Sequence, residues 1–114
     1  MSEFTPIYTE KTAKGVRISF TTESGIEAGH AYIFFITNDL HDKPYALLED
    51  LCVIESVRSQ GVGSALLTEA IAVARKHECY KILATSRTER DRIHAWYERK
   101  GFQKYGYEFR MNLI

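Results

Sequence analysis

Residues 45–66 read YALLEDLCVIESVRSQGVGSAL, and this stretch decides the fold. Residues 45–54 form a largely apolar run of strand length, bounded by turn-forming residues. From Gly61 onward, Val62, Ala65 and Leu66 lie three and four residues apart, which is the spacing of one helical face. The stretch therefore predicts a strand, a short turn and a helix in immediate succession.

The junction between this strand and helix has the features of an anion site. The first N–H groups of a helix lack internal partners, and the helix dipole adds partial positive charge there. Gly61 and Gly63 carry no Cβ, so a ligand can approach the backbone closely, and Arg58 can add a full charge. No Lys-Ser/Thr pair follows, so this is not a Walker loop. It also lacks the third glycine of the dinucleotide fingerprint. A pyrophosphate site is predicted, with a plain tight strand-to-helix connection as the alternative.

Upstream of this stretch the pattern is that of an antiparallel meander. Residues 16–22 alternate apolar and polar side chains, residues 26–37 form a second, aromatic-rich strand, and Ser24-Gly25 supplies the turn between them. Residues 38–44 are polar and end in proline, which predicts a loop.

Downstream the chain alternates between strand and helix signals. Residues 80–85 are expected to form a short central strand. In residues 89–100, Ile93, Trp96 and Tyr97 mark one face of an amphipathic helix. Gly101 is placed to end that helix in the left-handed conformation. The tail, 103–113, is expected to be a strand or hairpin. The order β-β-β-α-β-α-β predicts an α/β fold, a mixed sheet with flanking helices.

Composition narrows the class of protein. The chain has 114 residues, the size of a single domain, so we assign 1–114 to one domain. Its net charge is zero, which argues against a nucleic-acid binder. No membrane span or secretory signal is expected. Cys52 and Cys79 are interpreted as reduced cysteines of a cytoplasmic protein. The four histidines are scattered without ligand spacing, so no metal site is expected.

Two motifs together resemble one protein family. The arrangement strand–turn–R-x-x-G-x-G–helix at residues 58–63 resembles the acetyl-CoA motif of the GCN5-related N-acetyltransferase (GNAT) superfamily. Residues 90–102, RDRIHAWYERKGF, resemble its second motif, in which a tyrosine precedes a Gly-Phe pair; here these are Tyr97, Gly101 and Phe102. The two motifs cover about residues 45–113, and their separation is similar to that in the family.

The resemblance implies how acetyl-CoA would be held. In the family, the strand before the motif pairs its backbone with pantetheine, while the side chains of Leu51 and Val53 belong to the core. The pyrophosphate lies on the amides that open the helix, with added charge from Arg58. The residues implied are Leu51, Cys52 and Val53 for pantetheine, and Arg58, Ser59, Gln60, Gly61, Val62, Gly63 and Ser64 for the pyrophosphate.

The resemblance also implies roles in proton transfer. An amine is mostly protonated at neutral pH and must lose a proton before it attacks a thioester. Tyr97 matches the family's proton donor to the leaving thiolate; the alternative is a core aromatic. Glu49 and Asp50 resemble the Leu-Glu-Asp stretch of polyamine acetyltransferases and are expected on opposite strand faces. Glu49 is a candidate base acting through water, Asp50 a candidate cation-binding group, and simple solvation is the alternative for both. His94 is a further candidate base, or a hydrogen-bonded structural residue.

Two departures from the family pattern concern the acceptor. Arg90 stands where the family often has a cofactor-contacting asparagine. Only residues 1–15 precede the strand at 16–22, so we expect the two N-terminal helices that wall the acceptor site in the family to be missing here, with residues 4–9 a candidate first strand. The acceptor side is then expected to be open, for a bulky amine, or completed by a homodimer. Tyr32, Phe34 and Phe35 are a candidate interface or, alternatively, plain core.

The sequence therefore predicts an acetyl-CoA-dependent N-acetyltransferase that acts on a primary amine, either of a protein or of a small molecule. A non-catalytic module that binds acetyl-CoA or CoA is the main alternative. A small nucleic-acid-binding domain is the second.

Overall fold

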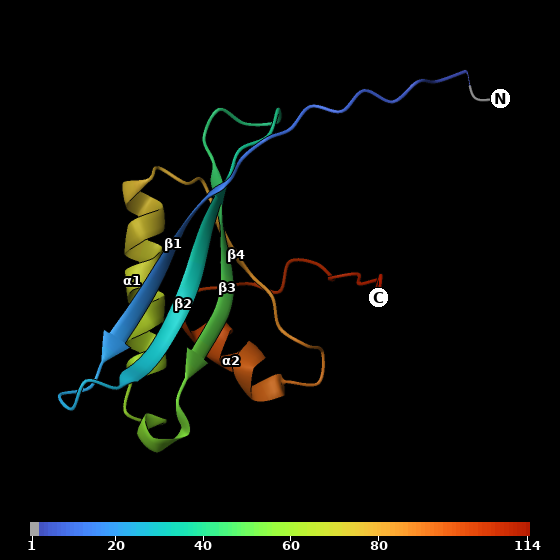
Figure 1. Cartoon of the computed structure of the whole chain (residues 1–114). Helices are drawn as coiled ribbons and strands as arrows, with labels where there is room; N and C mark the ends of the chain where they lie inside the picture. The colour runs from blue at the N-terminus through green and yellow to red at the C-terminus, as the bar shows by residue number, and fades with distance from the viewer. Residues whose placement is uncertain (1–2) are drawn as a thin grey trace. The chain divides into compact units, whose positions relative to one another are not determined.

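The computed structural model describes residues 3–114 and has an α/β architecture, as predicted (Figure 1). In chain order the elements are β1 (Lys14–Thr21), β2 (Glu27–Ile36), β3 (Tyr45–Val53), the short 3₁₀ turn η1 (Glu55–Val57), α1 (Val62–Lys76), β4 (Ile82–Ala84) and α2 (Asp91–Arg99). The contacts divide the chain into two compact units, Met1–Leu83 and Ala84–Ile114. Each unit is described by itself below.

The four strands form one sheet in the order β1-β2-β3-β4. The first three form an antiparallel meander, with Val16 opposite Ile33 and Ile33 opposite Leu48. The predicted turn joins β1 to β2, and Gly25 adopts φ 91° there. β4 is reached through α1. The bonds from Tyr80 N–H to Pro44 O and from Ala46 N–H to Lys81 O advance in the same direction along both segments, so β4 runs parallel to β3 and the sheet is mixed.

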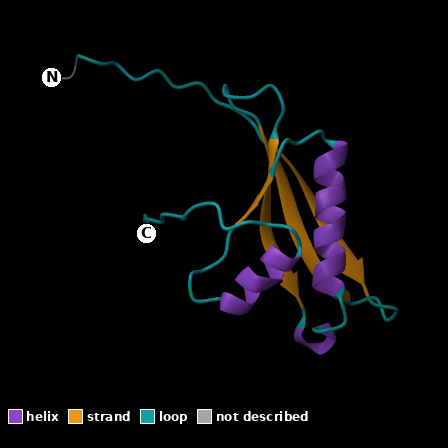
Figure 2. Ribbon diagram, turned by 180° about the vertical axis from the view of Figure 1, so that it is seen from behind, coloured by secondary structure: helices purple, strands orange, loops and turns teal. Residues whose placement is uncertain are grey.

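The core of the first unit lies between α1 and one face of the sheet (Figure 2). Alternate residues of the strands point into it, so that burial follows the period of two expected for a one-sided sheet. Leu66 and Leu67 of α1 are almost completely buried against them, and each such side chain contributes roughly 1.5–3 kcal/mol. The buried apolar residues are Ala28, Ala31, Ile33, Phe35, Ala46, Leu48, Leu66, Leu67, Ala70 and Ala74.

Gly29 allows α1 to approach the sheet closely. A Cβ at this position would lie 2.7 Å from the carbonyl oxygen of Cys52, 3.1 Å from Leu66 Cδ1 and 3.2 Å from Val62 Cγ1. The space that a side chain at Gly29 would need is therefore filled by residues of the first turns of α1 and by the backbone of β3. This contact sets the distance between the start of the helix and the end of β3.

Two terminal predictions of strand are wrong. Residues 4–9 and 103–113 are in neither strand nor helix, and Tyr105, Tyr107 and Phe109 are each more than four-fifths exposed. Alternating apolar residues favour a strand, but a strand exists only within a hydrogen-bonded ladder, and that pairing is a tertiary property. No helix lies within residues 3–13, which agrees with the short form of the fold predicted from the sequence. Neither described helix has the length and apolar character needed to cross a bilayer.

We expect Gly29→Ala to destabilise the protein, because the new methyl group would overlap a backbone carbonyl that cannot move without shifting β3. Overpacking of this kind costs about 1–3 kcal/mol. Gly106→Ala is the matched control, since nothing lies within 4 Å of a Cβ there. Urea denaturation of both variants measures the difference. Equal stability of the two would show that the close approach at Gly29 is not maintained in solution.

Candidate functional site

The start of α1 presents several backbone amides without acceptors. Gly61, the residue before the helix, adopts the left-handed conformation (φ 86°, ψ 7°), and no side chain caps the helix. The first amide of the helix with a backbone partner is that of Ala65, which donates to Gly61 O at 3.0 Å. Within the described chain, the amides of Val62, Gly63 and Ser64 have no hydrogen-bond acceptor. They form a set of adjacent N–H donors at the positive end of the helix dipole.

The turn before the helix is held by its own hydrogen bonds. The amides of Arg58 and Gln60 donate to Glu55 O and Val57 O at 3.2 and 3.3 Å, so the Gln60 amide is already used. Ser59 adopts φ 70°, which is uncommon for a residue other than glycine. The Arg58 Nε–H donates to Val53 O at 3.2 Å, and this bond ties the side chain to the end of β3. The terminal guanidinium nitrogens of Arg58 remain available to a ligand.

This arrangement fits a diphosphate. Charged oxygens need several N–H donors, and the free amides of Val62, Gly63 and Ser64 are contiguous. The first turn of α1 contains no acidic residue that would repel an anion. Nothing lies within 4 Å of a Cβ at Gly61, so the backbone there is open to approach. Of the predicted pyrophosphate residues, all except Gln60 thus have a free amide or, in Arg58, a charged group.

The end of β3 is the second part of the predicted cofactor site. β4 has three residues against nine in β3, and it pairs beside Ala46 at the beginning of β3. Residues 51–53 of β3 therefore extend past the end of β4. Leu51 and Val53 are half-buried and Cys52 is exposed. The backbone of this segment thus lies at a sheet edge that β4 does not cover, on the side that faces away from β2, although Val53 O already accepts a hydrogen bond from Arg58 Nε–H.

A bulge in β3 places Glu49 and Asp50 on the same face of the sheet. Tyr32 is opposite Glu49, but His30 is opposite Cys52, so β3 has one more residue than β2 between these pairs. Asp50 adopts φ 50° in the bulge and its carboxylate lies 2.9 Å from His30 Nε2. The prediction that the two carboxylates lie on opposite faces is wrong, because the extra residue interrupts the alternation. Glu49 is exposed and has no side-chain partner among residues 3–114.

In the second unit, α2 holds Tyr97 by the way the helix ends. Gly101 has φ 102°, as predicted; its N–H donates to Glu98 O at 3.1 Å, and the Phe102 N–H donates to Tyr97 O at 3.0 Å. These two bonds make a Schellman motif. Such a motif commonly includes an apolar contact between the two residues that the longer-range bond joins, which here are Tyr97 and Phe102. Here that contact is the edge-to-face pair of Tyr97 and Phe102, with ring centroids 5.2 Å apart. The Tyr-x-x-x-Gly-Phe spacing therefore orients the tyrosine.

Other polar groups of the second unit differ in their availability. Burial raises the pKa of the Tyr97 phenol above its ordinary value of 10.0, so the hydroxyl keeps its proton at neutral pH. The ring of His94 lies 2.7 Å (Nε2) from Arg87 O, which supports the structural interpretation of this histidine. The Ser86 hydroxyl is buried and has no partner among the described residues. A buried polar atom without a partner is available to a ligand.

The sequence matches a family profile over residues 15–102, and the description of that family is acetyltransferase (GNAT) family. The chain belongs to this family. No curated protein matches the chain. Within residues 3–114, no group of three or more His, Cys, Asp or Glu side chains is arranged to hold a metal ion.

Solved structures agree with the GNAT assignment. An acetyltransferase from Trypanosoma brucei is 25% identical with a TM-score of 0.80, over 87% of this chain and 69% of its own. Glucosamine-6-phosphate N-acetyltransferase from Arabidopsis thaliana has the same TM-score at 17% identity, over 88% of this chain and 67% of its own, and shows the fold alone. A transcriptional regulator from Bacillus halodurans is similar at 25% identity and TM-score 0.73, over 77% of this chain and 59% of its own.

Two features of this GNAT domain were not found from the sequence. The sequence pattern does not separate His30 from the other scattered histidines, and it gives no signal at Ser86. The pairing of His30 with Asp50 depends on the strand register and on the bulge, and neither has a local sequence signal. The unusual φ of Asp50 is compatible with its residue type, because aspartate tolerates the left-handed region better than most residues.

The Tyr97 phenol should ionise at higher pH than an exposed tyrosine. A raised folded-state pKa means that the contribution of Tyr97 to stability is fully present below pH 10, the unfolded value, and is lost as pH rises through the folded value. The difference in phenolate absorbance between wild type and Tyr97→Phe isolates this group from the other tyrosines. A difference titration centred at or below the ordinary value would contradict the burial of the hydroxyl.

Proposed function

We propose that this GNAT protein transfers the acetyl group of acetyl-CoA to a primary amine. The observation that carries the proposal is the set of unpaired amides that follows the left-handed Gly61 at the start of α1, in an R-x-x-G-x-G context typical of the family. Membership of an acetyltransferase family supports acetyl transfer in general. The proposal adds to this general activity a primary amine as the acceptor and specific roles for individual residues.

The proposed cofactor site uses mainly backbone groups. The amides of Val62, Gly63 and Ser64 would hold the pyrophosphate, with those of Ser59 and Gly61 beside them and with charge from Arg58. The backbone of residues 51–53 would pair with pantetheine. Acetyl-CoA supplies the activated acetyl group and a thiolate as leaving group. A backbone site tolerates side-chain variation, so specificity for the cofactor depends on the local fold more than on side-chain chemistry.

Two proton transfers are needed besides the formation of the C–N bond. The ammonium form of the acceptor must lose a proton before the nitrogen can attack, and Glu49, exposed and unpaired, remains a candidate to accept it through water. The departing sulfur takes a proton from Tyr97, whose buried phenol is protonated at neutral pH. The second proton of the amine can return to Tyr97 through solvent, which restores the enzyme.

The acceptor is proposed to be a bulky or exposed amine, or one whose site is completed by a second copy of the chain. No helix within residues 3–13 provides a wall of the kind expected from the longer family members. The proposed homodimer would use Tyr32 and Phe34 of β2; Phe35, the third residue of the predicted interface, is buried in the core.

Arg58→Gln should weaken binding of coenzyme A, because it removes a positive charge beside the proposed diphosphate. A charged hydrogen bond contributes roughly 1.5–3 kcal/mol, so Kd should rise by about 10- to 100-fold. Arg75→Gln is the matched control, since Arg75 is at the opposite end of the same helix. Isothermal titration calorimetry gives both constants. Equal losses in the two variants would place the diphosphate elsewhere, and no binding by the wild type would exclude the proposed function.

Tyr97→Phe should reduce turnover while leaving the affinity for acetyl-CoA nearly unchanged. Loss of a positioned acid typically lowers the rate by roughly 10²- to 10⁴-fold. The release of the CoA thiol is followed with a panel of primary amines, and cofactor affinity is measured separately. A wild-type protein that binds acetyl-CoA and acetylates nothing would instead be a binding module. An unchanged rate in the variant would remove Tyr97 from the mechanism.

A further inference from the structure

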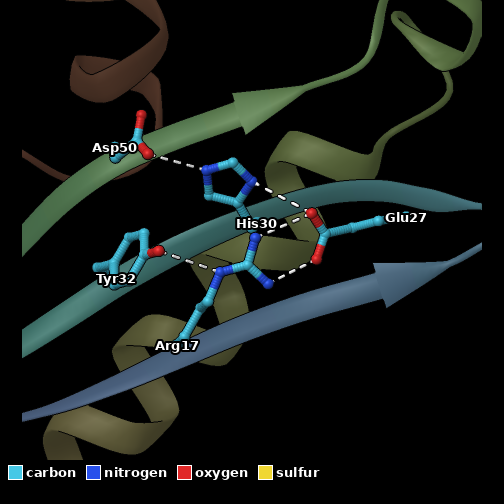
Figure 3. Close-up of polar contacts among 5 residues, drawn as sticks. All are labelled: Arg17, Glu27, His30, Tyr32 and Asp50. Carbon is cyan, nitrogen blue, oxygen red and sulfur yellow. Dashed lines mark hydrogen bonds and ion pairs between the residues drawn. The ribbon is translucent and has the colours of Figure 1, made fainter.

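A chain of charged side chains crosses β1, β2 and β3 on the sheet face opposite α1 (Figure 3). His30 lies between two carboxylates: Asp50 Oδ2 is 2.9 Å from its Nε2, and Glu27 Oε2 is 3.5 Å from its Nδ1. Arg17 contacts Glu27 with both terminal nitrogens, at 2.5 and 2.9 Å, and its Nε donates to the Tyr32 hydroxyl at 3.2 Å. These contacts link the charged side chains continuously from β1 to the bulge in β3.

The surroundings of His30 suit a ring that carries an extra proton. A neutral imidazole has one N–H donor and one lone pair, so one of its nitrogens would present a lone pair to a carboxylate oxygen. An imidazolium has two N–H donors; Asp50 is within hydrogen-bond distance of Nε2, and the Glu27 carboxylate is within ion-pair distance of Nδ1. Histidine is also the side chain whose charge changes most readily near neutral pH. The geometry is therefore that of a group able to take up and hold a proton.

The remaining groups around His30 support the same role. Arg17, through its hydrogen bonds, lowers the pKa of Glu27 below its ordinary value, so this carboxylate stays ionised beside the ring. Tyr32, on the same strand, packs its ring edge-to-face against the His30 ring, with the two ring centroids 5.8 Å apart. Among the described residues, the charged or titratable groups that face His30 are thus Glu27 and Tyr32 of β2, Asp50 and the Cys52 thiol of β3 and, behind Glu27, Arg17 of β1.

Asp50 and His30 differ in how far their side chains are exposed to solvent. The Asp50 side chain is 65% exposed and that of His30 only 20%, so an incoming cation would meet Asp50 first. His30 is opposite Cys52 in the β2–β3 register, within the segment proposed to pair with pantetheine. This row of charged side chains therefore ends next to the part of β3 where the acetyl donor is proposed to lie. Because Arg17 is occupied by Glu27, the cluster offers an anionic group and no free cation.

We propose that Asp50 binds the acceptor as an ammonium ion and that His30, through Asp50, takes up the proton that this ammonium loses. The inference rests on the proposed function and identifies the acceptor as an amine that is cationic at neutral pH. The ammonium N–H bond breaks, its electron pair stays on nitrogen, and the proton passes by way of the Asp50 carboxylate to His30. The free amine then attacks the thioester carbon, the C–S bond breaks, and His30 later releases its proton to solvent. His30 and Glu27 act as positioning residues.

The first test follows the His30 ring by NMR in the free protein and needs no acetylation. Addition of 1,3-diaminopropane, a dication at neutral pH, should move the titration midpoint of His30 to lower pH, because a cation on Asp50 disfavours the imidazolium. The shift should disappear in Asp50→Asn. His41, on an exposed loop, serves as the internal control. Equal shifts of both histidines, no shift of His30, or a shift that persists in Asp50→Asn would overturn the inference without affecting the proposed cofactor site.

The second test is the pH dependence of acetylation for amines that the wild type accepts. His30→Asn should lower kcat/KM at neutral pH by about 10²-fold or more, the usual effect of losing a positioned base. The loss should diminish as pH rises and the amine deprotonates unaided, and should vanish with an arylamine, which is neutral at pH 7. Glu27→Gln should show a smaller loss of the same kind. His41→Asn, matched in chemistry, should leave the pH profile unchanged.

One control and two further outcomes decide between this inference and its rivals. Calorimetry with coenzyme A and thermal unfolding show whether each variant remains folded, and His30→Gln replaces His30→Asn if the latter does not. A loss that is the same at every pH and for every amine indicates a structural role and overturns the inference. If Glu49→Gln, and not His30→Asn, abolishes the pH dependence, Glu49 is the proton acceptor and the inference is wrong.

Discussion

The structure depends on a constraint at one junction: a helix that begins immediately after a left-handed glycine has backbone donors that the protein itself does not satisfy. Gly61 makes the turn into α1, and the amides of Val62, Gly63 and Ser64 are left without acceptors. Such donors are normally satisfied by caps, water or ligands. Here no side chain caps the helix, so these donors are free for the proposed anionic ligand, and the helix start lacks the stabilisation that a cap would give.

The position of this junction is determined by close packing behind it. Gly29 permits the first turns of α1 to lie against β2, and the absence of a side chain there leaves room for the carbonyl of Cys52. The same region of β3 contains the bulge at Asp50, which changes the direction of the following residues. One missing side chain and one additional residue thus place the helix start and the end of β3 together. The proposed pyrophosphate and pantetheine contacts both derive from this arrangement.

The proposed proton transfers involve side chains that lie in different electrostatic environments. Burial keeps the phenol of Tyr97 protonated, whereas ion pairing with Arg17 keeps Glu27 ionised. His30 lies between Glu27 and Asp50, with a carboxylate near each ring nitrogen. Acyl transfer from a thioester to an amine that arrives as an ammonium ion requires two kinds of group. One must take a proton from the ammonium, and another must give a proton to the leaving thiolate.

The sequence by itself determined the strand–turn–helix at residues 45–66, the helix end at Gly101 and the family, because periodicity, glycine and spacing act locally. Tertiary structure alone decided three other features. The segments 4–9 and 103–113 have strand-like patterns and form no strand, since a ladder needs a partner. Glu49 and Asp50 share a face because β3 has a bulge opposite β2. His30 meets Asp50 only through that register, and contact between residues twenty positions apart is a property of the folded sheet.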